Sequence, residues 1–334
     1  MGKCTIKKPK GNKMNPELFW FEDNEKLLIE FENLLREKGE SIRPDSSIAN
    51  IALTIREMYS VHKKKISIDL TKDYREDWRR AIGLNDLIRK IVSAREHPDF
   101  ANLWPHILLL LNDSNIVQNI WSPKDDEISN KIFELYMALS LIRNGANLKM
   151  DNPKRTSRGK NPDILIDIDK HCWAFACKAI HSNQIRTLND RIREGLKQID
   201  NSDADRGIVL INLKNLIDHD SIWSITRDMM TNIVTYKAFP SAAEAYNILV
   251  QMGKVIAYNV SNEIIGDEGY DLVFNTNKAA PFALVFFSTV VTSIKDNKNT
   301  FTYLRLLMPI PGKNIDQEDY NISNIINDGI HDRL

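Results

Sequence analysis

The spacing of hydrophobic residues changes character near residue 122, and this change constrains the fold of the 334-residue chain more than any other feature. Before it, hydrophobic residues recur at helical intervals, as in residues 27–35, where they share one helix face. After it, strand-like runs alternate with helical ones. The pattern predicts an α/β protein: a basic flexible tail (1–14), an all-α domain (15–121), and a domain over 122–334 in which helices flank a central mixed sheet.

The second half of the chain carries recognisable start and stop signals for individual elements. A helix is expected to follow Pro123 and to end before Asn144-Gly145. Two strands then meet at a tight turn, Asp169-Lys170-His171. The segment from Asp316 onward is acidic and is expected at the surface. The other expected elements are helices near 185–200, 218–235 and 241–253, and strands near 207–213, 282–291 and 300–310.

Composition limits the classes of function. Lysine plus arginine and aspartate plus glutamate each number 45, so the net charge is zero and any contact with nucleic acid must be local. The N-terminus has no apolar leader, and no apolar run is long enough to span a bilayer. Three cysteines form a sparse and odd-numbered set, which is typical of a reducing compartment. We therefore expect a cytoplasmic protein without a membrane segment.

Three ionisable residues stand out against apolar surroundings. Glu134 is the one ionisable residue in the ten-residue run 133–142, where a carboxylate needs a compensating cation or donor. Lys178 shares a strand face with alanines and an isoleucine, and Asp163 opens the preceding strand. A hairpin brings Asp163 near the level of Lys178. The three groups suit metal-assisted phosphodiester hydrolysis, with Mg²⁺ or Mn²⁺ held by Asp163 and Glu134 and with Lys178 acting on the water or the phosphate.

The segments that carry these residues resemble the PD-(D/E)XK nuclease superfamily, which has the restriction-endonuclease-like fold. The resemblance covers about residues 125–213 and rests on FELYMALSLIRNGANL, PDILI, WAFACK and GIVLINL. It implies that Asp163 is the first metal ligand, Lys178 the catalytic lysine and Glu134 the helix acid. The chain departs from the family's motif at Ala176, where the second acid should stand two residues before the lysine. Cys177 fills the position between them.

The departure at residue 176 keeps two other hypotheses open. In one, the nuclease fold is catalytically degenerate and serves as a nucleic-acid or protein binding module. In the other, the charges belong to ordinary surfaces of an interaction protein: Asp163 closes a turn, Lys178 reaches to the sheet edge, and Glu134 pairs with Arg143 or a backbone donor. The position of the Glu134 carboxylate relative to Asp163 and Lys178 discriminates between an active and a degenerate site.

Basic residues in two neighbouring segments are candidate contacts with nucleic acid, with DNA as the first expectation. One group lies in the polar loop before the hairpin, and the other forms a stripe along the helix expected near 185–200, where a solvated helix face is the alternative explanation. Nucleases that cut both strands of DNA often act as dimers, so a homodimer is expected. The candidate residues are Lys154, Arg155, Arg158, Lys160, Arg186, Arg193, Lys197 and Gln198.

Overall fold

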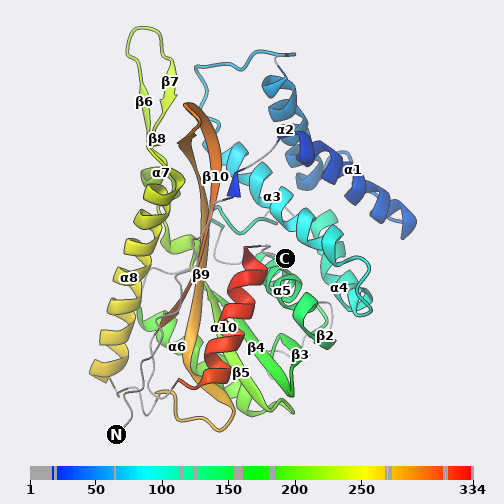
Figure 1. The fold of residues 1–334 in the computed structure, drawn as a ribbon, viewed down its shortest axis with the longest axis vertical. Helices are drawn as coiled ribbons and strands as arrows, with labels where there is room; N and C mark the ends of the chain where they lie inside the picture. Colours follow the sequence, from blue (N-terminus) through cyan, green and yellow to red (C-terminus); the bar gives the residue numbers. More distant parts are fainter. Residues whose placement is uncertain are drawn as a thin grey trace, which may run out of the picture.

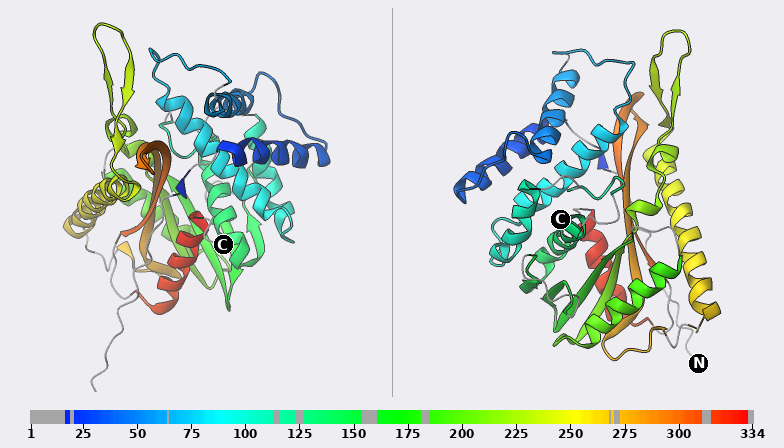
Figure 2. Two further views of the ribbon diagram at one scale, coloured as in Figure 1. Left: turned by 45° about the horizontal axis from the view of Figure 1, so that its top comes forward. Right: turned by 180° about the vertical axis from the view of Figure 1, so that it is seen from behind.

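The computed structural model describes most of the chain, and the predicted basic tail and the basic loop at Lys154, Arg155, Arg158 and Lys160 lie outside the described residues. A mixed sheet runs through the molecule and helices cover both of its faces (Figures 1 and 2). The α/β class and the mixed central sheet predicted from the sequence are therefore confirmed. The described residues are 17–18, 21–63, 65–112, 116–122, 127–153, 161–180, 185–267, 269, 273–310 and 315–331.

The central sheet has eight strands in the order β1-β10-β9-β5-β4-β3-β2, with β8 paired to β9 outside this path. The pairs β2–β3, β3–β4, β9–β10 and β1–β10 are antiparallel, whereas β4–β5, β5–β9 and β8–β9 are parallel. The strands are β1 (Glu17–Leu18), β2 (Ala146–Met150), β3 (Ile164–Ile168), β4 (His171–Ala179), β5 (Arg206–Asn212), β8 (Ala238–Phe239), β9 (Ala279–Lys295) and β10 (Lys298–Ile310).

The hairpin β3–β4 forms where the sequence predicts it. Ile168 pairs with His171, so the connection is the two-residue turn Asp169-Lys170. Asp169 has φ 54°, a left-handed conformation that aspartate tolerates better than most residues. Alternate residues of β4 then face opposite sides of the sheet. Strand β2, which the sequence analysis did not predict, adds an antiparallel neighbour on the outer side of β3.

Helices pack on the two faces of the sheet in separate groups (Figure 2). Helices α6 (Ile185–Asp200) and α8 (Ala242–Asp267) cover one face, and α3 (Arg75–Ala94), α5 (Glu127–Leu141) and α10 (Gln317–Ile330) lie on the other. The predicted helix over 185–200 is confirmed by α6, whose bounds coincide with it. Outside α3 and α5 lie α1 (Phe21–Glu37), α2 (Ser47–His62) and α4 (Phe100–Ile107), with the short 3-10 helices η1 (Leu108–Leu111) and η2 (Ile142–Asn144) after α4 and α5.

The N-terminal helices share one hydrophobic core with the sheet. Asp86 on α3 accepts hydrogen bonds from Arg305 Nη1 on β10 (2.5 Å) and from the Tyr136 hydroxyl on α5 (2.8 Å). Lys90, also on α3, donates through Nζ to the carbonyl oxygens of Gly329 and Ile330 at the end of α10 (2.6 and 3.1 Å). The region is helical apart from β1, and its division from the sheet near residue 121 stays a prediction.

Two segments differ from the sequence-based expectation. Residues 218–235 were predicted to be helical, but only α7 (His219–Ile222) is, and β6 (Ile225–Arg227) and β7 (Val234–Tyr236) follow as a protruding hairpin (Figure 1). The segment from Asp316 onward is not merely a surface stretch, because it forms α10 and buries Ile326 and Ile330 completely. Among the described residues, no helix is both long and apolar enough to cross a membrane.

Candidate functional site

Asp163 is held in place where β3 begins and β4 ends. It precedes Ile164, which pairs with Phe175, so Asp163 lies across from Ala176. The Asp163 amide donates to the Phe175 carbonyl (3.0 Å), and the Cys177 amide donates to Asp163 Oδ2 (2.7 Å). The first contact continues the strand pairing, and the second fixes the carboxylate against the edge of the hairpin, where Asp163 is only 7% exposed.

Glu134 reaches this carboxylate from helix α5. The helix packs on β4 and buries Glu134 among core residues, leaving it 3% exposed. The Glu134 and Asp163 carboxyl groups lie close enough that the charge of Glu134 raises the pKa of Asp163. Lys131, one helical turn earlier, places Nζ 2.9 Å from Glu134 Oε1 and 3.9 Å from Asp163 Oδ1. The structure therefore brings together two of the predicted residues and adds a lysine that the sequence analysis did not single out.

Burial dominates the electrostatics of the two acids. Desolvation raises the pKa of Glu134 to about 7, although the charge and the hydrogen bond of Lys131 oppose this. Desolvation and the charge of Glu134 raise the pKa of Asp163 to about 7, against the charges of Lys178 and Lys131. Both carboxyl groups thus titrate near neutral pH and act as a coupled pair, which favours any cation that can enter between them.

Lys178 acts on the same pair from strand β4. Its side chain is half-buried, and its positive charge lowers the pKa of Asp163. Two residues earlier, Ala176 is fully buried beneath helix α6. A Cβ atom added to Gly195 of α6 would lie 3.3 Å from the Ala176 Cβ, so the helix approaches this strand closely. Ala176, where the resemblance implies a second acid, is therefore closely packed against α6.

His106 is a further neighbour that the sequence analysis missed. It lies on α4, is 1% exposed, and places Nε2 3.4 Å from Glu134 Oε2. Burial and the charge of Lys131 lower its pKa to about 4, so the imidazole is neutral at physiological pH. A histidine inside the otherwise apolar stretch LWPHILLLL was the available signal. The apparent division into two domains hid its connection with Glu134.

The chemistry of the two carboxylates fits a hard divalent cation. Mg²⁺ is commonly bound through one or two carboxylates and keeps several waters. Within the described parts of the chain, no group of three or more histidine, cysteine, aspartate or glutamate side chains is arranged to hold a metal ion. The ammonium of Lys131 supplies the positive charge between Glu134 and Asp163, and a metal would have to replace these contacts.

Three of the predicted nucleic-acid contacts form a stripe on α6. Arg186 and Lys197 are exposed, and Arg193, between them, is half-buried. Gln198 does not belong to this stripe, because it is 4% exposed and turns toward the protein interior. Its contact with nucleic acid stays a prediction, which this burial does not favour. Consecutive helix positions point about 100° apart. Lys197 therefore faces the solvent, whereas its neighbour Gln198 faces the protein interior.

Comparison with known proteins provides no relative for this arrangement: no family model, no curated protein and no solved structure matches the chain. The function must be inferred from the site.

Proposed function

We propose that the chain is a metal-dependent nuclease that hydrolyses phosphodiester bonds, with DNA as its substrate. The observation that carries the proposal is the convergence of the buried carboxyl groups of Glu134 and Asp163 on one ammonium, that of Lys131, with the positive charge of Lys178 acting on Asp163. The element order supports it: α5, β3, β4, α6 and β5 occur in the order of the PD-(D/E)XK superfamily, which the sequence resembles, with η2 and β2 between α5 and β3. The parallel pairing of β4 with β5 agrees with a crossover through α6.

In this proposal Asp163 and Glu134 hold Mg²⁺ or Mn²⁺. The bound ion would supply positive charge at the scissile phosphate and lower the pKa of a water molecule. Asp163 is oriented by the Cys177 amide, and Glu134 is oriented by α5. Lys178 offsets negative charge on the phosphate or orients the attacking water. For both carboxylates to hold the cation, the Lys131 ammonium would have to give up its contacts with them.

The α6 stripe supplies the second part of the proposal. Arg186, Arg193 and Lys197 lie along the side of the helix that faces away from the sheet, where they can follow phosphates of a nucleic-acid backbone. Each such contact releases counterions, so affinity should fall steeply with salt concentration. We further propose that the protein acts in the cytoplasm and as a homodimer, since cleavage of both DNA strands needs two sites.

A degenerate nuclease fold that only binds nucleic acid is the second candidate, and Lys131 and Ala176 favour it. The Lys131 ammonium already contacts both carboxylates, and Ala176, which stands where the second acid should be, is fully buried beneath α6. This candidate predicts salt-sensitive binding of nucleic acid that does not depend on a divalent cation.

Calorimetric titration of Mn²⁺ tests the proposal without requiring the substrate to be known. Asp163→Asn and Glu134→Gln should each abolish the binding isotherm, whereas Lys178→Ala should keep it. Glu127→Gln is a matched control, because Glu127 lies on the same helix as Glu134 and is exposed. Cleavage of supercoiled plasmid should require both acids and Lys178. Absence of Mn²⁺ binding by the wild type at millimolar concentration would leave the binding-module candidate instead.

A further inference from the structure

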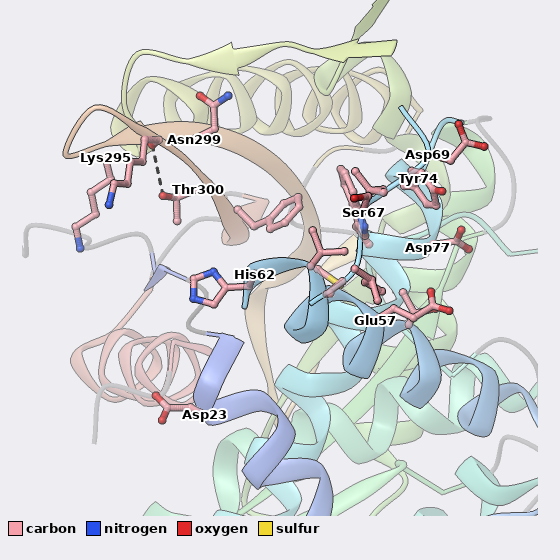
Figure 3. Close-up of a pocket in the computed structure, with 18 of the residues that line it drawn as sticks. Asp23, Glu57, His62, Ser67, Asp69, Tyr74, Asp77, Lys295, Asn299 and Thr300 are labelled. Atoms are coloured by element: carbon pink, nitrogen blue, oxygen red, sulfur yellow. Dashed lines mark hydrogen bonds between the residues drawn. The ribbon is translucent and has the colours of Figure 1, made fainter. Parts of the chain in front are cut away.

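A large pocket lies at the opposite end of the molecule from Glu134. Its volume is about 1000 Å³, and it is enclosed by α2, α3, the segment between them and the tip of the β9–β10 hairpin (Figure 3). The strand register shows its separation from the candidate nuclease site. Lys178 pairs with Ile211 and Ile211 with Val285, whereas the pocket residue Lys295 lies ten positions farther along β9. At about 3.3 Å per residue this corresponds to roughly 33 Å along the strand.

The floor of the pocket is apolar and aromatic. Met58 on α2 lies against it, together with Trp78 on α3 and Phe301 on β10. The Trp78 ring is fixed by its neighbours: it stacks on Tyr74 with ring centroids 5.6 Å apart and meets Phe301 edge-on at 4.9 Å. A floor whose rings are already packed costs little conformational entropy when a ligand binds. The volume and lining are typical of small-molecule sites.

Carboxylates dominate the charge of the pocket. Five acidic side chains line it against two lysines. Figure 3 shows Glu57 and Asp77 at the same end of the pocket, beside Tyr74, with Lys295 at the other end. In the described part of the chain no ion pair joins Glu57 or Asp77 to a base, and the nearby Arg80 is occupied by Glu76 at 2.7 Å. The acids are Asp23, Glu57, Asp69, Asp77 and Asp296, and the lysines are Lys295 and Lys298.

We propose that this pocket binds an organic cation, in which an ammonium or guanidinium group is attached to an apolar or aromatic body. The body packs on Trp78, Phe301 and Met58, and the cationic group lies between Glu57 and Asp77. Aromatic faces and carboxylates both attract a cation, and an apolar body gains from leaving water, so the two parts of the lining select the same class of molecule. This binding site is independent of the nuclease proposal.

Three probes that share a phenyl ring but differ in charge separate this selectivity from simple hydrophobic binding. Benzyltrimethylammonium, benzyl alcohol and benzoate are titrated into the full chain by calorimetry. The cation should bind, the alcohol should bind about tenfold more weakly, and the anion should not bind, because one ion pair together with one cation–π contact is worth roughly 1.4 kcal/mol. Equal binding of the cation and the alcohol, or no binding of the cation at millimolar concentration, would overturn the proposal.

The double variant Glu57→Gln with Asp77→Asn locates the site. Both side chains are exposed, so the substitutions should leave folding intact. The affinity for benzyltrimethylammonium should fall about tenfold while that for benzyl alcohol stays the same. Asp203→Asn, an exposed acid outside the pocket, is the matched control and should bind the cation as the wild type does. An unchanged affinity in the double variant would mean that the cation binds elsewhere, and would refute the assignment.

Discussion

Replacement of Glu134 by glutamine should change how the stability of the protein depends on pH. Burial disfavours the Glu134 carboxylate and raises its folded-state pKa to about 7, against an ordinary value of 4.5. A carboxyl group with a raised pKa contributes its full stability below the unfolded-state value and loses it as the pH rises through the folded-state value. The wild type should therefore lose stability from this residue between about pH 4.5 and pH 7.

The size of the effect follows from the two pKa values. The gap between about 7 and 4.5, at about 1.36 kcal/mol per pH unit, corresponds to roughly 3 kcal/mol. Glutamine has a similar shape but does not titrate. The free energy of unfolding of the variant should therefore increase by this amount relative to that of the wild type as the pH rises from about 4.5 to about 7. Removal of the Glu134 charge also lowers the pKa of Asp163, which adds to the gain.

Urea unfolding at a series of pH values measures this difference, in buffer containing a chelator. Buried His219 has a pKa lowered to about 4 and contributes stability that is lost as the pH falls. It is common to both proteins and cancels when the variant is compared with the wild type. Glu127→Gln should follow the wild type at every pH, because Glu127 is exposed. A difference between Glu134→Gln and the wild type that does not vary with pH would refute the burial and coupling of the pair.

Other changes test separate parts of the structure. Lys131→Met should raise Mn²⁺ affinity by at least tenfold in calorimetry, because the ammonium contacting Glu134 no longer competes with the metal. Without metal, the free energy of unfolding of this variant should be about 3 kcal/mol or more below that of the wild type at pH 8. A Cβ at Gly329 would lie 1.8 Å from the Ser140 carbonyl oxygen, so Gly329→Ala should lower the urea midpoint by separating α10 from α5, at a cost of about 2 kcal/mol or more. Met229→Ser, at a fully exposed hairpin position, should change stability by less than about 0.5 kcal/mol and should reduce self-association in light scattering.

Local signals were sufficient for part of the fold. The hairpin of β3 and β4 was predictable because alternation and a two-residue turn are encoded within twenty residues. The hairpin of β6 and β7 was missed because its turn depends on side-chain contacts. Asp228 accepts hydrogen bonds from the amides of Met230 and Thr231, and Asn232 adopts φ 60°. These contacts replace the helix that the spacing of apolar residues suggested.

The candidate site, like the fold, could be predicted only in part from the sequence. Glu134 could be singled out because one charge in an apolar helix needs compensation wherever the helix packs. The compensating groups could not be assigned, since Lys131 looked like an ordinary helix charge and His106 lies on α4, in the region predicted to be a separate domain. Ala176 shows the same limit, because its fit beneath Gly195 depends on how closely α6 approaches the sheet.

The contacts of Asp86 and Lys90 have a consequence for biosynthesis. Their partners, Arg305 and the carbonyls that end α10, are 219 and about 240 residues later in the chain. At translation rates of about 5 to 20 residues per second, roughly 10 to 45 s separate the synthesis of Asp86 from that of Arg305. During that time the nascent N-terminal helices carry a carboxylate and an ammonium whose C-terminal partners have not yet been synthesised. The ribosome-bound chain is then exposed to chaperones and proteases until α10 emerges.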